Sequence, residues 1–227
     1  YNKINVVYLQ SKSKIINLDV KMDNLLFYEI ALTLIPGIGD VNAKKLVAYC
    51  GGAEAVFREK RKNLAKIPGI AERSIESIVS QDSLSRAEKE LCFVEKNNIK
   101  ILYYLNHDYP KRLKHCYDSP VIIYCKGETD LNVAKVIGVV GTRNVTDYGR
   151  DLSDNIIKEL SSDDVMVVSG LAYGVDTCAH KAALNNELKT VAVLAHGFQT
   201  IYPAVNAKLA KRIVEQGGCL LTENISG

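Results

Sequence analysis

Several signatures of common protein classes are missing from this chain. No apolar run approaches the roughly 20 residues that span a bilayer. The stretch Leu25–Ile38 resembles the apolar part of a signal peptide, but it contains Glu29 and runs into a Pro-Gly turn. The six cysteines form no CxxC pair and have no zinc-ligand spacing with the four histidines. We therefore expect a cytoplasmic protein with reduced thiols and with no membrane contact, metal or other cofactor.

The common nucleotide-binding motifs are also missing. Gly138 and Gly141 bracket the end of a predicted strand and Thr142-Arg143 follow, which is not GxGxxG, and Ser169 rather than an acidic residue ends the next strand. A ribose 2′-hydroxyl would lack its usual carboxylate, which argues against NAD. No Gly-Lys-Ser/Thr sequence occurs either, and this excludes a P-loop.

The overall charge does not identify a partner. Of the 227 residues, positions 1–135 carry 21 Lys and Arg against 16 Asp and Glu, whereas positions 136–227 carry eight against ten. The shift in pattern near residue 130 favours two domains. If the second domain binds a polyanion, we expect it to use local groups and backbone N–H rather than a broad basic field.

The first domain contains a repeat. The sequence IPGI occurs at 35–38 and 67–70, each time between two helix-like stretches, as in a helix-hairpin-helix. We predict such a small all-helical (SAM-like) domain over residues 22–82, after a poorly packed extension at 1–21. Gly37 and Gly39 would permit a tight turn and a second DNA contact at the following helix. A packing module of the same shape, without DNA, is equally compatible with the repeat.

The second domain, residues 83–227, alternates short apolar strands with helices. This pattern predicts a doubly wound, Rossmann-like α/β fold, a parallel sheet with helices on both faces. The predicted strands are Ile99–Leu105, Val121–Cys125, 136–140, 164–168, 189–195 and 219–222, and the predicted helices are 82–98, 149–161, 174–187 and 205–216. Because the last strand has no closing helix, we expect the domain to be truncated at its C-terminal end.

Three loops follow consecutive strands of this domain, and in a parallel sheet they share one edge. We expect a phosphate cradle there, made by backbone N–H of 141–143, a helix beginning near Gly149, and the guanidinium of Arg143. Asp176 would cap backbone N–H groups. It would also pair with His180, although His180 could instead act as a general base. Phe198 and Tyr202 could stack on bases or simply cover the sheet.

Four strings closely resemble the DNA-processing protein A (DprA/Smf) family. They are VVGTRNVTDYG, VVSGLAYGVDTCAHKAAL, AVLAHGFQTIYPAVNAKLAKRI and GGCLLTE, and they occur in that order. The resemblance implies a bacterial single-stranded DNA-binding protein of natural transformation and recombination. Such a protein protects incoming DNA, helps to load the RecA recombinase, works as a homodimer through its α/β domain and is not an enzyme.

The resemblance also assigns residues. Gly141, Thr142 and Arg143 would meet the DNA backbone. The adjoining pocket would be formed by Ser169, Gly170, Gly174, Gly197, Tyr202, Pro203 and Asn206. Tyr173 receives no role. The chain departs from the family where it stops, before a basic stretch and a winged-helix-like domain, so we expect it to hold half of a binding site.

Two alternatives remain open. The same edge could serve a nucleotide or nucleoside-phosphate hydrolase, with His180 or Glu223 as acid–base and Asp176 as the other candidate carboxylate. Alternatively, the helical domain could make all the DNA contacts while the α/β domain acts as a dimer scaffold.

Overall fold

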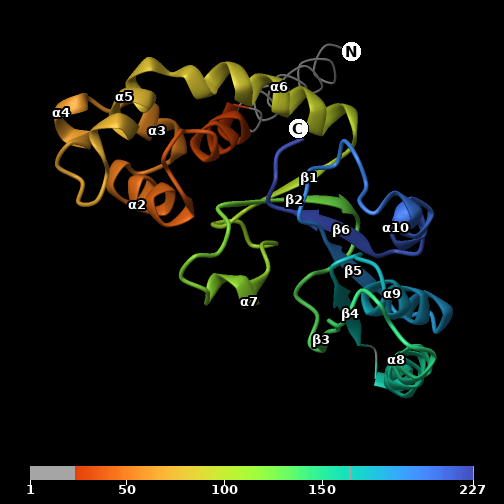
Figure 1. Ribbon diagram of the computed structural model, residues 1–227. Helices are drawn as coiled ribbons and strands as arrows, with labels where there is room; N and C mark the ends of the chain where they lie inside the picture. Colours follow the sequence, from red (N-terminus) through yellow and green to blue (C-terminus); the bar gives the residue numbers. More distant parts are fainter. Residues whose placement is uncertain (1–23, 164, 227) are drawn as a thin grey trace, which may run out of the picture. The chain divides into compact units, whose positions relative to one another are not determined.

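The computed structural model describes residues 24–163 and 165–226, and the predicted extension at 1–21 lies outside them. The chain divides into two compact units that meet at residues 92 and 93. This junction falls inside α6 (Asp82–Lys96), so a single helix contributes to both units (Figure 1). None of the described helices combines the length and apolarity needed to cross a membrane.

The described part of the first unit is helical. Its elements are a helix over residues 24–33, α2 (Asp40–Cys50), α3 (Ala53–Arg58), α4 (Arg61–Leu64), α5 (Glu72–Ser80) and most of α6. Each IPGI sequence forms the turn between two of these helices. Gly37 and Gly69 adopt φ angles of +76° and +80°, left-handed values that glycine reaches without steric cost.

The two turns pack on each other's helices. Lys45 of α2 donates a hydrogen bond of 2.8 Å from Nζ to the carbonyl of Pro68 in the second turn. In return, a Cβ on Gly37 of the first turn would lie 3.1 Å from the Ser74 hydroxyl of α5. The repeat predicted from the sequence therefore folds as a pair of mutually supporting hairpins.

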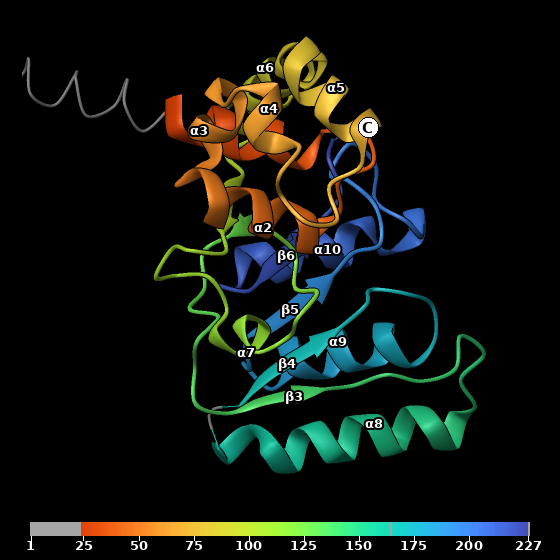
Figure 2. The same cartoon turned by 90° about the vertical axis from the view of Figure 1, so that its left-hand side faces the viewer.

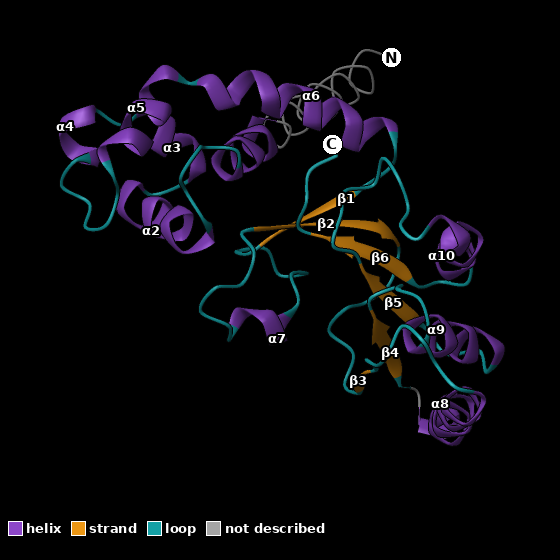
Figure 3. Ribbon diagram, viewed as in Figure 1, coloured by secondary structure: helices purple, strands orange, loops and turns teal. Residues whose placement is uncertain are grey.

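The second unit contains a six-stranded sheet in the order β1-β2-β6-β5-β4-β3 (Figure 3). The strands are β1 (Lys100–Tyr103), β2 (Ile122–Gly127), β3 (Val136–Gly138), β4 (Met166–Ser169), β5 (Thr190–Val193) and β6 (Cys219–Thr222). Strands β3 to β6 are parallel, as predicted, whereas β1 and β2 extend the sheet in antiparallel fashion beside β6. The Rossmann-like class is confirmed.

Helices lie on both faces of this sheet, but unequally (Figures 1 and 2). One face carries α8 (Asp147–Leu160), α9 (Val175–Asn185) and α10 (Ala207–Glu215), and the other carries the short α7 (Lys111–Lys114). Strands β3 to β6 are neighbours in chain order, so three right-handed crossovers place their helices on the same face. The parallel strands therefore do not reverse their order, and the sheet is not doubly wound.

Alternate side chains along each strand form two cores. On the α8–α10 face, Val167 packs with Ile157 of α8, and Ala192 and Leu220 pack with Ile213 of α10. On the α7 face, the buried cluster consists of Leu102, Tyr109, Ile123, Cys125, Met166, Val191, Cys219 and Leu221. Burial of the parallel strands on both faces explains why their sequences lack polar alternation.

Glu29 gives the helical unit a predictable pH dependence. Burial of this carboxyl raises its pKa from 4.5 to about 7. Because the folded pKa lies above the unfolded value, the contribution of Glu29 to the free energy of unfolding is largest below about pH 4.5 and is lost as pH rises through 7. We expect Glu29→Gln to remove this decline, making the protein more stable than the parent by about 3 kcal/mol at pH 8. Urea unfolding of both proteins, followed by circular dichroism at pH 5 and pH 8, measures the effect. The same difference in free energy of unfolding between variant and parent at both pH values would contradict the prediction.

Candidate nucleic-acid interface

Three loops follow the carboxyl ends of β3, β4 and β5 and lie against one another. The N–H of Val175, just after the second loop, donates to the carbonyl of Thr142 in the first at 3.1 Å. The side-chain amide of Asn206, in the 3₁₀ turn η2 (Ala204–Asn206) after the third loop, donates to the carbonyl of Leu171 in the second at 2.8 Å. The predicted convergence of the three loops on one edge is confirmed.

Beside two of the predicted DNA-binding glycines, the space that a side chain would need is filled by neighbouring loop residues. Gly174 has φ +77°, and a Cβ there would overlap the carbonyl oxygens of Thr142 and Arg143. A Cβ on Gly141 would lie 2.6 Å from the Cγ2 atom of Val175. These glycines let the first two loops pack closely, which fixes the backbone that carries Arg143.

Gly170 and Gly197 serve loop packing in the same way. The backbone N–H groups of Gly170 and Ala172 donate to one carboxylate oxygen of Asp176, at 3.1 and 3.3 Å, and a Cβ on Gly170 would lie 2.8 Å from that oxygen. A Cβ on Gly197 would overlap the carbonyl oxygen of Ile225. The predicted role of Asp176, binding backbone N–H groups, is confirmed.

Three other predicted site residues are buried. The Ser169 hydroxyl donates to the carbonyl of Val139 at 2.8 Å. Asn206, besides its bond to the second loop, donates to the Thr177 hydroxyl at 2.8 Å. Pro203, the residue before the turn η2, is also buried. The polar bonds of Ser169 and Asn206 are made inside the protein, so these side chains shape the edge.

Thr142, Arg143 and Tyr202 are the predicted side chains that reach solvent. No ion pair of Arg143 is recorded within residues 24–163 and 165–226. The Tyr202 ring is 65% exposed and stands edge-on to Tyr173, with 6.4 Å between the ring centroids. Phe198, in contrast, packs against the core on the α8–α10 face, so it covers the sheet.

The helix start expected to complete the phosphate cradle is already capped. Helix α8 begins at Asp147, two residues before the predicted start. The Thr146 hydroxyl accepts the N–H of Gly149 at 3.2 Å, and the Asp147 carboxylate pairs with Arg150. The Gly149 N–H is thus not available to a phosphate, and a carboxylate stands in the first turn.

His180 has a different partner from the one predicted. Its ring is fully buried, and Nδ1 lies 2.8 Å from the Thr190 hydroxyl, which itself donates to the carbonyl of Val167. Nδ1 is therefore the donor. Burial lowers the His180 pKa to about 4, against an opposite effect of Asp176. The Asp176 carboxylate bonds backbone N–H groups instead, so a neutral, enclosed His180 is poorly suited to acid–base catalysis.

A groove of about 980 Å³ begins at Arg143, Gly174 and Asn206 and collects cations that the sequence analysis missed. Arg150, Lys181, Lys208 and Arg212 also line it, so five of the eight basic side chains of residues 136–227 gather here. Among the described residues, one of the acidic side chains of that segment, Asp154, lines the groove. The four-residue spacing of Lys208 and Arg212 on one helix face was the available sequence signal.

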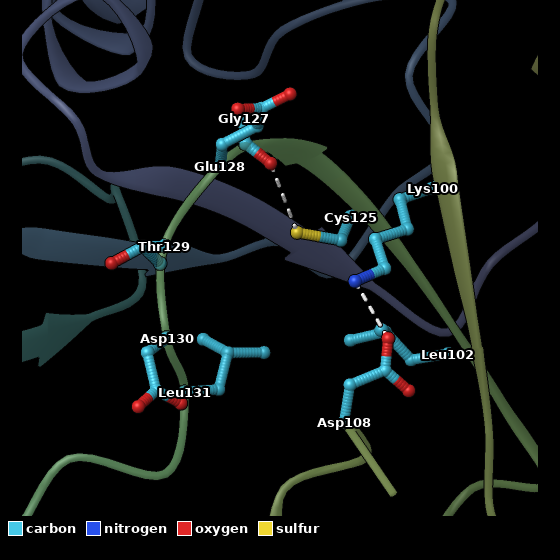
Figure 4. Close-up of a pocket in the computed structure, with 9 residues that line it drawn as sticks. All are labelled: Lys100, Leu102, Asp108, Cys125, Gly127, Glu128, Thr129, Asp130 and Leu131. Carbon is cyan, nitrogen blue, oxygen red and sulfur yellow. Dashed lines mark hydrogen bonds and ion pairs between the residues drawn. The ribbon is translucent and has the colours of Figure 1, made fainter. Parts of the chain in front are cut away.

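A second cavity, of about 340 Å³, lies on the α7 face (Figure 4). Lys100 and Asp108 form an ion pair of 2.6 Å in its wall. Burial would raise the Asp108 pKa, but Lys100 holds it below the usual value. Cys125 is buried there and contacts Cys219 of the neighbouring strand, a contact that lowers the pKa of the Cys125 thiol. None of the predicted site residues lines this cavity. Neither here nor in any other part of the chain that the structure describes could a cluster of His, Cys, Asp and Glu hold a metal ion.

Comparison with known proteins defines the class. The chain belongs to the DNA recombination-mediator protein A family, whose model matches residues 100–227. A SAM-like helix-hairpin-helix tandem matches residues 29–81. The resemblance to the DprA/Smf family and the predicted helical fold of the first unit are both confirmed.

Particular relatives give the extent of the similarity. The DNA processing protein DprA of Bacillus subtilis is 36% identical over 126 residues, which are 55% of this chain and 42% of that protein. Protein Smf of Synechocystis is 29% identical over 194 residues, which are 84% of this chain and 49% of that protein. The X-ray structure of DprA from Streptococcus pneumoniae superposes with a TM-score of 0.71 at 30% identity, covering 88% of this chain and 68% of that chain. This chain spans less than half the length of these two curated relatives.

Loop packing at Gly174 can be tested by substitution. We expect Gly174→Ala to destabilise the protein by about 2–4 kcal/mol, because the added Cβ would push the backbone of Thr142 and Arg143 away from residue 174. Gly138→Ala is the matched control, since a Cβ there meets nothing within 4 Å. Thermal unfolding of the three proteins measures the difference, and equal midpoints for both variants would show that this close packing does not matter.

Proposed function

We propose that this chain binds single-stranded DNA, largely without sequence preference, through the loop edge of its α/β unit. Arg143 carries the proposal: it is exposed, has no recorded ion pair among the described residues, and stands on a backbone fixed by two glycine contacts. A guanidinium binds phosphate in a bidentate manner. Membership of the DNA recombination-mediator protein A family supports the same ligand.

In this proposal the remaining predicted residues have two kinds of role. Thr142 and Tyr202 reach solvent, and Tyr202 with Tyr173 offers exposed rings on which bases can stack. The other residues shape the edge from behind: Gly141, Ser169, Gly170, Gly174, Gly197, Pro203 and Asn206. Protection of incoming DNA, loading of RecA and a homodimer are further parts of the proposal, and they rest on the family resemblance. A cytoplasmic location is also part of the proposal, and it rests on the cysteine pattern of the sequence.

A DNA contact at Gly37 and Gly39 has less support. Helix α2, which follows this turn, begins with Asp40, and α5, which follows the second turn, begins with Glu72. A carboxylate in the first helical turn repels a phosphate that would bind the same N–H groups. Mutual packing is the role that the contacts of these turns favour. We also propose no catalytic step, because the enclosed His180 is a poor acid–base group.

We expect Arg143→Ala to weaken binding of every single-stranded sequence alike, by about tenfold at low salt, because one charge-assisted phosphate contact is lost. The dependence of log K on log salt should become shallower by about 0.7. Lys189→Ala is the control, because Lys189 precedes β5 at the opposite end of the strands. Fluorescence anisotropy with oligonucleotides of two compositions at several salt concentrations gives both quantities. Unchanged binding by Arg143→Ala would refute the site.

A further inference from the structure

The groove that starts at Arg143 runs over the outer surface of α9. Thr177, Cys178, Lys181 and Asn185 line it at helical spacing, so they form its floor along one face of α9. Burial, followed by the Asp154 carboxylate, raises the pKa of the Cys178 thiol, while Arg150 and Lys181 act in the opposite direction. These charged groups therefore surround the middle of the floor.

Helices α8 and α10 form the walls of this groove. From α8 come Arg150 and Asp154, and from α10 come Lys208 and Arg212. Lys181, Lys208 and Arg212 are exposed and have no recorded ion pair within the described residues. Arg150 is paired with Asp147. Lys211 points elsewhere: it pairs with Glu215 and does not line the groove.

In the other direction along the edge, two described segments lack cationic side chains. The third loop, residues 194–203, and the segment 222–226 after β6 contain no lysine or arginine. A strand that followed the edge from Arg143 toward β6 would meet no cationic side chain of these segments. A strand that turned across the helices would meet four more.

We propose that single-stranded DNA bound at Arg143 leaves the loop edge and crosses the helical layer in this groove, where Lys181, Lys208 and Arg212 hold its phosphates. The proposal rests on the proposed function and adds a path for the strand. The ligand follows from charge complementarity: five basic side chains and one acidic one, Asp154, line the groove, while residues 136–227 together carry more acidic than basic residues. The aromatic pair Tyr173 and Tyr202 stands near the entrance, and Tyr173 lines the groove.

The length of the groove sets the expected site size. Helix α9 has 11 residues, so its axis is about 16 Å long. At about 3.4 Å per stacked nucleotide, this length accommodates about five nucleotides beyond the one held at Arg143. Three phosphate contacts from the groove should contribute about two to the salt dependence of binding, at about 0.7 each.

The test is a salt titration with an oligonucleotide of about 20 nucleotides, long enough to occupy both segments. The groove variant combines Lys181→Gln, Lys208→Gln and Arg212→Gln. We expect its slope of log K against log salt to fall by about two relative to the parent chain. Lys211→Gln, on the other side of α10, should change nothing. Replacing Lys181 and Lys208 by arginine should keep the parent slope, and circular dichroism checks that each variant is folded.

Each outcome separates the path from the function. If the groove variant keeps the parent slope while Arg143→Gln loses affinity, the strand stays on the edge: the path is wrong and the function stands. If neither variant differs from the parent, or the parent does not bind, both proposals fail. A duplex of equal length could also bind the parent as tightly as the single strand does, with the groove variant lowering its slope of log K against log salt by the same amount. That result would assign the groove to double-stranded DNA and overturn the inference.

Discussion

The close approach of Gly174 to the carbonyl groups of Thr142 and Arg143 is the contact on which the candidate interface depends. It joins the first loop to the second, and Asn206 then ties the second loop to the turn before α10. Arg143 is consequently carried on a backbone that three elements hold in place. A cation on a fixed backbone binds phosphate with less loss of freedom than one on a mobile loop.

Basic residues are few in positions 136–227 of the α/β unit, but most of them lie together. Positions 136–227 have more acidic than basic residues, yet five of the eight basic ones line a single groove. The expectation that this domain would bind a polyanion through local groups rather than a broad basic field stays a prediction, and the groove supplies such local groups. The cations come from loops and helices far apart in the sequence, and three crossovers with the same hand bring them to one side of the sheet.

The helical unit illustrates how one sequence motif can serve packing. Its two turns repeat the same four residues, and each turn contacts the helix that follows the other. Lys45 donates to the second turn, so a cation that could have met DNA from this helix is engaged within the unit. The helix that follows each turn begins with an acidic residue, Asp40 in α2 and Glu72 in α5.

The sequence by itself determined the paired hairpins, the parallel strands and the loop edge with Arg143, because these follow from local turn chemistry and apolar periodicity. The tertiary structure decided the rest. It showed that Gly141 and Gly174 are filled by neighbouring loops, that Thr146 caps α8, and that His180 bonds Thr190, since such contacts join residues that no local pattern relates. The tertiary structure also placed Lys181 and Arg212 in one groove. The order of the strands and the direction of their crossovers set which helices are neighbours, and residue spacing along the chain does not encode either.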